Sequence, residues 1–443
     1  MRALILNAAP GPDPQLDELT ARVASDFVAR RYAVETFALR DVPVAYCQGC
    51  FECWTKTPGI CKIDDAGRDL SAAFTVCDVV VLVTPVLFGS YSSEAKKVLD
   101  RTLGTLLPFF RRIDGEVHHV PRYKYPPALG VIAVLDSPDP DVEQVVRVLA
   151  LRNAINFGAP LHSVGVVHRS GQSGAGFAAC DALVSTLTAT AARATIEEIE
   201  DVDTLLPVTP LAPDAPRPTR AMLLIGSAKP HGTSTSESLG SVLLERLALH
   251  GLDVSMRYVQ REAHDAASLH AFASAVRAHD LLIVAAPVYI DALPALVTRA
   301  LEAILSDRQG DAEPPPLTVA MVLNCGFPES RHASVARTIG ALFARRARAR
   351  WAGALQLGGG GAIHGEKLSA AGRIVHHLPP LLEDAAASLA SGRSLTAAVR
   401  DGFRQQLMPT TLYMAAGDAG WLWTASHEGA LTRLWERPAG AAG

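Results

Sequence analysis

Four of the seven cysteines lie within 15 residues, with the spacing Cys47-x2-Cys50-x2-Cys53-x7-Cys61. In the first three, each short turn brings one sulfur to one iron of a cubane cluster, whereas the fourth departs from the bacterial ferredoxin spacing. A structural zinc site usually has two separated pairs, so this run fits zinc less well. In a reducing compartment such crowding favours metal over disulfides. The stretch predicts a metal site, and a loop of free or redox-labile thiols is the alternative.

A second stretch, Gly226–Ser238, combines glycine with hydroxyl side chains. It follows an apolar run that is typical of a buried strand, Ala221–Ile225, and leads into Leu239–Leu247, which has helical periodicity. A helix N-terminus offers unpaired N–H groups, and glycine lets the backbone approach a ligand, so we expect a phosphate here. The loop matches neither the Walker nor the dinucleotide motif. An ordinary capped turn is the alternative, because Ser and Thr favour N-caps.

The loop after the third strand of the same half, Pro287–Asp291, offers a flat aromatic ring and backbone amides. In a doubly wound parallel sheet, ligands bind beyond the carboxyl ends of strands one and three, where the strand order reverses. A phosphate loop beside an aromatic loop suits a mononucleotide with a planar ring. Simple termination of the strand at Pro287 is the alternative.

The elements that position these loops occur twice. Strands and helices alternate in each half, which predicts βαβ units and parallel sheets. The strongest internal repeat aligns Cys77–Val86 with His279–Val288. The offset between the halves is 218 residues at strand one and 202 at strand three, so the first copy carries 16 extra residues. The cysteine loop lies in that interval, and we interpret the chain as a tandem duplication with an insertion.

We expect four segments: a first domain at 1–200, a proline-rich linker at 201–219, a second domain at 220–395 and a C-terminal extension at 396–443. A helix over 177–199 is expected to close the first domain. The aromatic residues of the extension favour packing on the second domain over disorder. The basic and aromatic stretch 111–125 could receive a dinucleotide phosphate, and a solvated loop is the alternative.

Composition excludes several classes of partner. The net charge is −4 and the pI about 6.4, which gives no sign of nucleic-acid binding. No apolar run reaches membrane length, because Asp291 and two prolines interrupt the longest one, Leu281–Val297. The N-terminus enters a strand directly and shows no signal peptide. We expect a soluble cytoplasmic protein.

In both halves the chain resembles the flavodoxin-like NAD(P)H-dependent FMN reductases and their multimeric-flavodoxin relatives. The resemblance implies two tandem flavodoxin-like, doubly wound parallel sheets of five strands with helices on both faces. It also implies that FMN is bound by three loops of the second copy. Their residues are Ser227, Lys229, Gly232, Thr233, Ser234, Thr235, Ser236, Pro287, Val288, Tyr289, Ile290, Asn324, Cys325, Gly326, Phe327, Pro328 and Glu329.

The first copy resembles the family at the loop after its third strand, in Pro85, Val86, Leu87, Phe88 and Gly89. It departs from the family at its strand-one loop, 7–14, which has no hydroxyl and has three prolines that lack N–H donors. Asp13 and Asp17 would also repel a phosphate. We therefore expect the second copy to be the better flavin site.

The resemblance implies a flavin-dependent oxidoreductase that takes hydride from NAD(P)H and passes electrons to a quinone, a flavin or another small-molecule acceptor. The flavin supplies the redox chemistry, so no catalytic side chain is required. Backbone N–H groups of loops 287–291 and 326–329 are expected to stabilise charge on the reduced ring. The cysteine run is similar to that of iron–sulfur flavoproteins, which carry a [4Fe–4S] cluster beside FMN.

Two other functions remain open: a non-catalytic FMN/[4Fe–4S] electron carrier, and a flavin-binding protein whose cysteines sense oxidation. From the resemblance we also expect either a pseudo-dimer of the two copies within one chain or a homodimer.

Overall fold

The computed structural model describes residues 1–171, 173–189, 200–363 and 365–438. It divides into two compact units, the first made of Met1–Asp201 with Met414–Gly443 and the second of Val202–Tyr413. The units divide after Asp201, so residues 202–219 of the expected linker belong to the second unit. The expected extension does not stay together, because residues 396–413 belong to the second unit and residues 414–443 to the first.

The first unit is built on a parallel sheet with the strand order β2-β1-β3-β6-β7. This is a doubly wound order whose switch point lies between the first and third strands. The strands are β1 (Arg2–Asn7), β2 (Ala33–Ala38), β3 (Val79–Pro85), β6 (Ala128–Leu135) and β7 (His162–His168). Strands β3 and β6 are buried almost throughout, as expected of central parallel strands covered on both faces.

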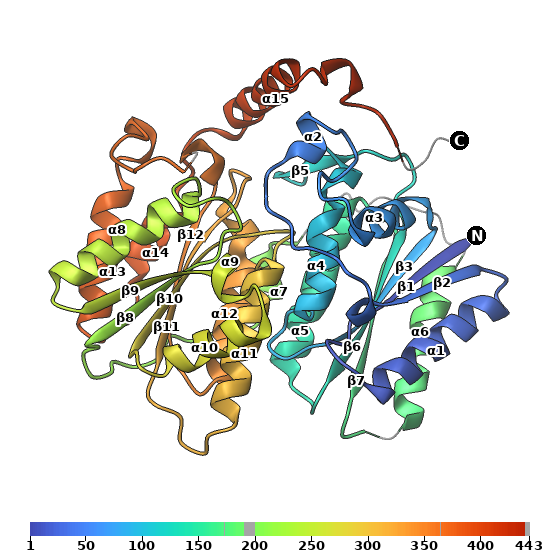
Figure 1. Ribbon diagram of the computed structural model, residues 1–443, viewed down its shortest axis with the longest axis horizontal. Coiled ribbons are helices and arrows are strands. Elements are labelled where there is room, and N and C mark those ends of the chain that lie inside the picture. Colours follow the sequence, from blue (N-terminus) through green and yellow to red (C-terminus); the bar gives the residue numbers. More distant parts are fainter. Residues whose placement is uncertain (172, 190–199, 364, 439–443) are drawn as a thin grey trace. The chain divides into compact units, whose positions relative to one another are not determined.

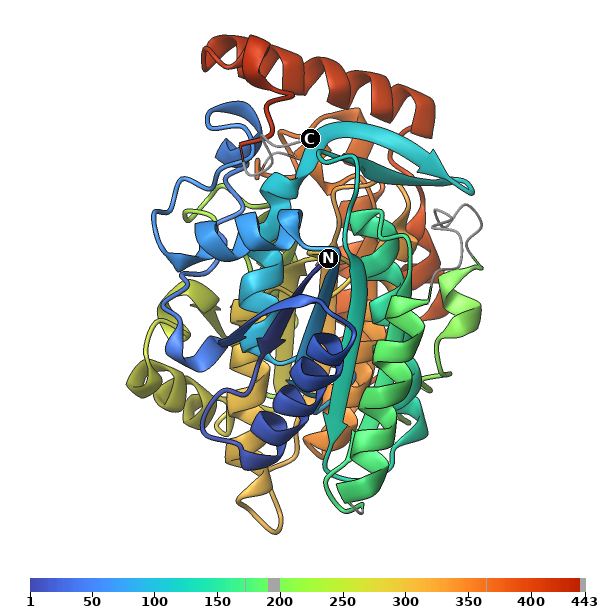
Figure 2. The ribbon, with the colours of Figure 1, turned by 90° about the vertical axis from the view of Figure 1, so that its right-hand side faces the viewer.

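Helices cover both faces of this sheet (Figures 1 and 2). On one face α1 and α6 pack together, and α3, α4 and α5 cover the other. The helices are α1 (Pro14–Ala29), α3 (Ala66–Val76), α4 (Ser93–Arg101), α5 (Pro140–Phe157) and α6 (Ser173–Thr188). The helix predicted over 177–199 is therefore present up to Thr188, and residues 190–199 lie outside the described part of the chain.

The second unit repeats the order in a sheet β9-β8-β10-β11-β12. The strands are β8 (Arg220–Ile225), β9 (Asp253–Tyr258), β10 (Leu281–Pro287), β11 (Thr318–Asn324) and β12 (Arg350–Leu357). One face carries α8 (Thr235–Leu249), α13 (Leu378–Ala390) and α14 (Ala397–Arg404). The other carries α10 (Ala266–Val276), α11 (Ala295–Gln309) and α12 (Ser334–Arg346), while α7 (Val202–Leu205) and α9 (Val259–Glu262) are single turns.

The duplication extends to individual hydrogen bonds. The carboxylate of Asp78, just before β3, accepts the backbone N–H of Arg2 at 2.7 Å. In the second unit the carboxylate of Asp280 accepts the backbone N–H of Arg220 at 3.0 Å. In each unit this aspartate fixes the start of strand three beside strand one, so the repeated aspartates have the same structural task. The expected fold of two tandem doubly wound sheets is confirmed.

The extra residues of the first copy lie between β2 and α3, where 27 residues (39–65) replace the seven (259–265) of the second unit. This segment holds the cysteines, η1 (Leu39–Asp41) and α2 (Glu52–Thr55). The expected position of the insertion is confirmed.

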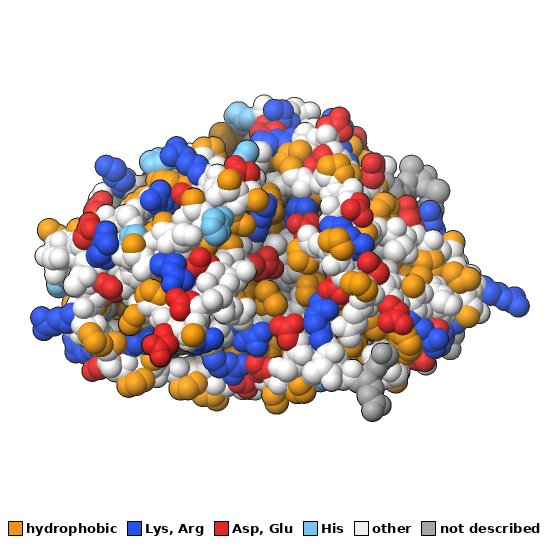
Figure 3. Space-filling model, turned by 60° about the horizontal axis from the view of Figure 1, so that its bottom comes forward, with side chains coloured by type: hydrophobic (Ala, Val, Ile, Leu, Met, Phe, Trp, Pro, Cys, Tyr) orange, Lys and Arg blue, Asp and Glu red, His pale blue; other side chains and the backbone are white. Residues whose placement is uncertain are grey.

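One addition, a hairpin in the first unit, was not expected from the sequence. Stretch 111–125 is largely a β-hairpin, with strands β4 (Leu106–Ile113) and β5 (Glu116–Pro121), and is not a solvated loop. The C-terminal segment forms α15 (Thr410–His427) and η6 (Leu431–Arg433), and the short helices are η2 (Thr102–Thr105), η3 (Ser330–Ala333), η4 (Gly360–Ile363) and η5 (Arg373–Val375). No helix in the described part of the chain is both long and apolar enough to cross a membrane. On the face shown in Figure 3, basic and acidic side chains are interspersed.

Candidate functional site

The strand-one loop of the second unit already contains a negative charge. Ser234 caps α8 by accepting the N–H of Glu237 at 3.2 Å. The Glu237 carboxylate turns back and accepts the N–H of Gly232 at 2.7 Å and the hydroxyl of Tyr258 at 2.9 Å. It is only 8% exposed. A carboxylate therefore lies at the helix N-terminus where a phosphate was expected.

The hydroxyl groups of this loop are directed to protein acceptors instead of a common centre. Thr235 donates to the carbonyl of Gly360 at 2.7 Å, and Ser236 donates to Oδ1 of Asn324 at 2.7 Å. The remaining bonds are Thr233 to the Pro230 carbonyl, Ser238 to the Ser234 carbonyl and the Lys229 N–H to Ser227 Oγ. The structure thus brings the strand-one and strand-four loops together, as expected, but through bonds that engage the hydroxyl donors of Thr235 and Ser236.

The strand-one loop of the second unit, as it is arranged, does not fit a phosphate. A second anion beside the Glu237 carboxylate would be repelled over a short distance. The segment after β12 also packs directly on the loop, because a Cβ placed on Gly365 would lie 2.2 Å from the carbonyl carbon of Thr233. The expectation that the second copy is the better flavin site has no direct test here, but these contacts count against it.

The expected ring-binding loops of the second unit are packed with their own side chains. Tyr289 and Ala292 exchange backbone hydrogen bonds of 2.9 and 3.1 Å across a tight turn in which Ile290 and Asp291 are left-handed. The N–H of Val288 donates to the carbonyl of Asn324 at 2.9 Å. Two of the N–H groups expected to stabilise a reduced ring are therefore already bonded to the protein.

Residues that the sequence analysis did not single out complete this cluster. The buried His332 lies 3.6 Å from Asp291 and 3.7 Å from Glu329. At the start of α15, Thr410 donates to Glu329 at 3.3 Å and the Tyr413 hydroxyl donates to the carbonyl of Gly326. Burial and the nearby acidic groups raise the pKa of the Cys325 thiol, so this cysteine is a neutral core residue. No local motif marks His332 or Tyr413 in the sequence.

In the first unit, the loop after β3 has unsatisfied polar groups. Ser90 and Tyr91 are 2% and 1% exposed, and neither hydroxyl has a hydrogen-bond partner among the described residues. The loop reaches them through Gly89, whose φ of 86° is the left-handed conformation that glycine adopts without strain. A buried hydroxyl without a partner costs stability, so it is an indication of a missing polar ligand.

The strand-one loop of the first unit lies beside the loop after β3. Ser92 donates to the carbonyl of Ala8 at 2.8 Å, which joins the two loops. Asp13 caps α1, and Arg169 at the end of β7 pairs with it at 2.5 Å. Burial alone would raise the pKa of Asp13, but the hydrogen bond from Arg169 keeps it below its usual value. The strand-one loop of the first unit therefore contains the Asp13 carboxylate, and the Arg169 guanidinium beside it could also bind the anionic group of a ligand.

The four cysteines of the insertion line one small cavity of about 20 Å³ with Lys62, Asp100 and Arg101. The N–H of Gly49 donates to the Cys47 sulfur at 3.5 Å. Burial raises the pKa of Cys47 to about 12, with a further contribution from Asp100, and burial also raises the pKa of Cys53. These two thiols are therefore protonated at neutral pH unless a metal binds them.

The geometry of the sulfurs distinguishes between metals. Around a tetrahedral zinc the sulfurs lie about 3.8 Å apart, because each Zn–S bond is about 2.3 Å. In the part of the chain that the structure describes, no three of these sulfurs lie within 4.8 Å of one another. A cubane cluster holds its thiolates farther apart, since each binds a different iron. The four sulfurs are therefore not arranged as a preformed zinc site, and a cavity with room for about one water would have to widen to hold a cluster.

The C-terminal segment forms an aromatic cover over the cysteine loop. Trp54 in α2 stacks on Phe51 with 5.2 Å between ring centroids, and Trp421 of α15 packs edge-on against Trp54 at 5.1 Å. The buried Arg122 fixes the end of the chain by donating to the carbonyls of Leu434 at 2.6 Å and Glu436 at 2.9 Å. The cysteine loop is therefore packed against a helix whose residues lie more than 300 positions away in the sequence.

Comparisons with known proteins agree with the first part of this arrangement. The model of the NADPH-dependent FMN reductase family matches residues 1–112. This stretch includes the cysteine loop and the loop with Ser90 and Tyr91, and the match confirms the expected resemblance in the first unit. No curated protein matches the chain.

Several solved structures have similar folds over part of the chain. An NAD(P)H:quinone oxidoreductase from Methanothermobacter marburgensis is 10% identical, with a TM-score of 0.34, over 43% of this chain and 96% of its own. An FMN-dependent NADH-azoreductase from Bacillus anthracis, in complex with FMN, is 13% identical, with a TM-score of 0.34, over 42% of this chain and 99% of its own.

Proposed function

We propose that this chain is an FMN-dependent oxidoreductase that takes hydride from NAD(P)H and passes the electrons to a quinone, a flavin or another small-molecule acceptor. The observation that supports it most is the family match over residues 1–112, within which the loop after β3 has two buried hydroxyls without partners. Bound FMN would supply the redox chemistry. Ser90 and Tyr91 would hold polar atoms of the cofactor, and Phe88 would supply apolar contact.

The first unit is the proposed flavin site for a further reason. A carboxylate lies at the N-terminus of the first helix in both units, Asp13 in the first and Glu237 in the second, but only Asp13 is paired with an arginine, Arg169. A phosphate entering the first site could exchange places with Asp13 on the Arg169 guanidinium, which binds oxyanions in a bidentate manner. The second unit would then act as a structural partner whose loops are closed by their own residues.

For the cysteine loop we propose a [4Fe–4S] cluster held by Cys47, Cys50, Cys53 and Cys61. The support is the shared cavity and the N–H bond from Gly49. Lys62 and Arg101 also line the cavity, and each is paired with a carboxylate, Glu52 and Asp65 respectively. The redox-sensor alternative is less well supported at Cys47 and Cys53, because a sensor cysteine needs a low pKa and exposure, and burial raises the pKa of both thiols. Cys50, which is exposed, is the candidate sensor under that alternative.

The test is a visible spectrum of protein purified without oxygen, with flavin and iron counted per chain, followed by rapid mixing with NADPH and with NADH. Fast bleaching of the flavin band and reoxidation by a quinone are expected. Bound flavin that neither nucleotide bleaches would favour the electron carrier. Colourless protein that does not bind added FMN would exclude a flavoenzyme.

The cluster is tested with Cys53→Ser and, as a control, Cys77→Ser, which changes an equally buried cysteine outside the cavity. Cys53→Ser should lose iron and its absorbance, while Cys77→Ser keeps both. Equal iron contents in the two variants would contradict the proposed ligands.

A further inference from the structure

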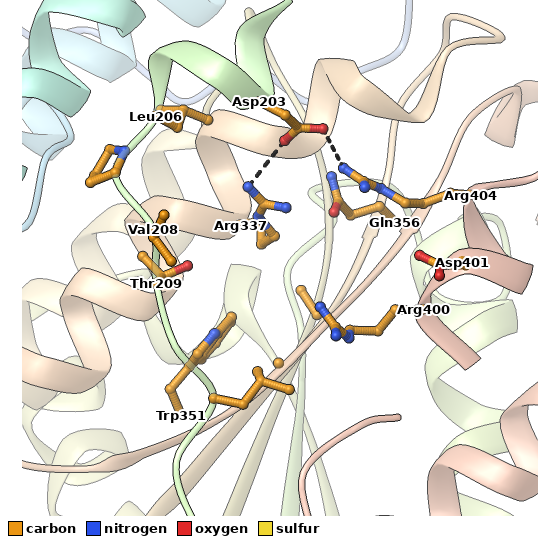
Figure 4. Close-up of a pocket in the computed structure, with 14 residues that line it drawn as sticks. Asp203, Leu206, Val208, Thr209, Arg337, Trp351, Gln356, Arg400, Asp401 and Arg404 are labelled. Carbon is orange, nitrogen blue, oxygen red and sulfur yellow. Dashed lines mark hydrogen bonds and ion pairs between the residues drawn. The ribbon is translucent and has the colours of Figure 1, made fainter. Parts of the chain in front are cut away.

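A second cavity, of about 300 Å³, lies within the second unit at the edge of its sheet, away from the loops discussed above. Its walls come from α7 and the chain that follows it, from α12, from the edge strand β12 and from α14 (Figure 4). Part of the expected linker, 206–211, is therefore the wall of a cavity. Nothing in the sequence analysis assigned a site to these residues.

Three arginines and two aspartates line the cavity: Arg337, Arg400, Arg404, Asp203 and Asp401. Asp203 pairs with Arg337 at 3.1 Å and with Arg404 at 2.7 Å. Burial alone would raise the pKa of Asp203, but the two guanidiniums hold it below its usual value, so it is an anion. One carboxylate is thus shared between two guanidiniums, which leaves positive charge uncompensated.

Arg400 is the third cation, and it has no ion partner. Its side chain is half-buried, and its guanidinium forms no hydrogen bond or ion pair with any residue in the described ranges. In Figure 4 it reaches from α14 into the space between Arg337 and Trp351. The Nε atoms of Arg400 and Arg337 are both buried without a partner. Unpaired buried donors on two neighbouring cations indicate an anionic acceptor that the protein itself does not supply.

The remaining walls limit the chemistry of that anion. Trp351, Leu206, Val208 and Leu211 provide apolar walls. In Figure 4, Leu206, Val208 and Trp351 lie on the side of the cavity opposite Arg400 and Arg404. The volume is at the lower end for small-molecule sites, which suits a ligand about the size of one substituted ring. The carboxylates of Asp203 and Asp401 would repel a second negative charge. A small organic acid with one carboxylate and an apolar body meets all of these conditions, and inorganic phosphate does not.

We propose that this cavity binds a small organic monocarboxylate, with the carboxylate on Arg400 and Arg337 and the apolar body against Trp351. The site is separate from the proposed flavin site and does not depend on the proposed function. It gives the second unit a binding role of its own, although its strand-end loops are closed.

Benzoate is a suitable probe, measured by calorimetric titration of the full-length protein. The compared variants are Arg400→Gln and, as a matched control, Arg393→Gln, whose exposed side chain is outside the cavity. Since Arg400 has no partner to lose, its replacement should leave the melting temperature unchanged. Benzoate affinity should fall about tenfold or more in Arg400→Gln, the usual size of a charge-assisted hydrogen bond, and stay constant in Arg393→Gln.

Two further ligands test whether the site requires a negative charge and whether it selects an organic acid over an inorganic anion. Benzyl alcohol has the same ring without the charge and should bind much more weakly than benzoate, and inorganic phosphate should not compete. The proposal is overturned if benzoate gives no saturable binding or if Arg400→Gln binds it as well as the unchanged protein. It is also overturned if benzyl alcohol binds equally or if phosphate displaces benzoate.

Discussion

At the scale of single residues, the two copies differ in what surrounds the carboxylate at the start of their first helix. Each first helix begins with a carboxylate that accepts N–H groups, Asp13 in the first unit and Glu237 in the second. Asp13 has the guanidinium of Arg169 beside it, while Glu237 accepts from Gly232 and Tyr258 and lies 3.3 Å from the His231 imidazole. An incoming anion would therefore meet an arginine at the first site and a histidine at the second.

Tyr91→Phe should have opposite effects on the empty and the loaded protein. Without flavin, losing a buried hydroxyl that has no partner should raise the free energy of unfolding by up to about 1 kcal/mol. FMN affinity should fall about fivefold, because the ligand loses one neutral hydrogen bond. Thermal melts and fluorescence titrations with FMN measure both effects. Unchanged FMN affinity would exclude Tyr91 from the site.

At the scale of elements, the sequence patterns predicted the regular repeat and the cysteine insertion, and missed the hairpin formed by β4 and β5. Val79–Pro85 and Leu281–Pro287 are continuous apolar runs, because central parallel strands are buried on both faces. Hairpin β4/β5 escaped prediction because its polar residues, such as His118, are buried by tertiary contacts that no local pattern reveals. The way in which Glu237 closes the strand-one loop of the second unit could have been predicted from the sequence, because Ser234 and Glu237 have the spacing of a capping box.

The stability of the protein should depend on pH through His119, which lies in strand β5 of the hairpin. Its ring packs against Trp54 at 4.5 Å and Phe110 at 5.2 Å, and burial lowers its pKa from 6.5 to about 3. The unfolded chain therefore binds a proton below pH 6.5 that the folded chain does not. Stability should fall as pH drops below 6.5, by at most about 1.4 kcal/mol per pH unit for this residue, because the ring keeps some exposure.

This dependence is measured by urea unfolding at neutral pH and at about pH 5. His119→Phe should lose less stability on acidification than the unchanged protein. His270→Gln, which replaces an exposed histidine, should behave like the unchanged protein. Equal losses in His119→Phe and the unchanged protein would show that His119 is protonated in the folded state.

Helix α15 should control access to the cysteine loop. Trp421→Ala removes the ring that packs on Trp54 and Phe51, so buried Cys53 should react several times faster with a thiol reagent. Trp423→Ala is the matched control, because it lies on the same helix and is 64% exposed. The rate at which Cys53 is labelled is measured by mass spectrometry in both variants. Similar rates in the two variants would contradict the role of α15.

At the scale of the whole molecule, duplication leaves two similar sheets with different tasks. The first unit has the inserted cysteines, the family match and the unsatisfied hydroxyls. The second has closed strand-end loops and a separate charged cavity. Sequence reasoning favoured the second copy for FMN because it counts hydroxyls, and it cannot tell whether those hydroxyls already have protein acceptors.

The stoichiometry of FMN tests this difference directly. We expect one FMN per chain after reconstitution, since the N-terminus of α8 already holds the Glu237 carboxylate.

Ser236→Ala removes a second-unit hydroxyl that donates to Asn324 and should leave FMN affinity unchanged, whereas Ser90→Ala in the first unit should weaken it. Flavin absorbance per protein and titrations of both variants provide the measurement. Two flavins per chain, or a loss of affinity in Ser236→Ala alone, would place FMN in the second unit, and Glu237 would then have to move aside to admit the phosphate.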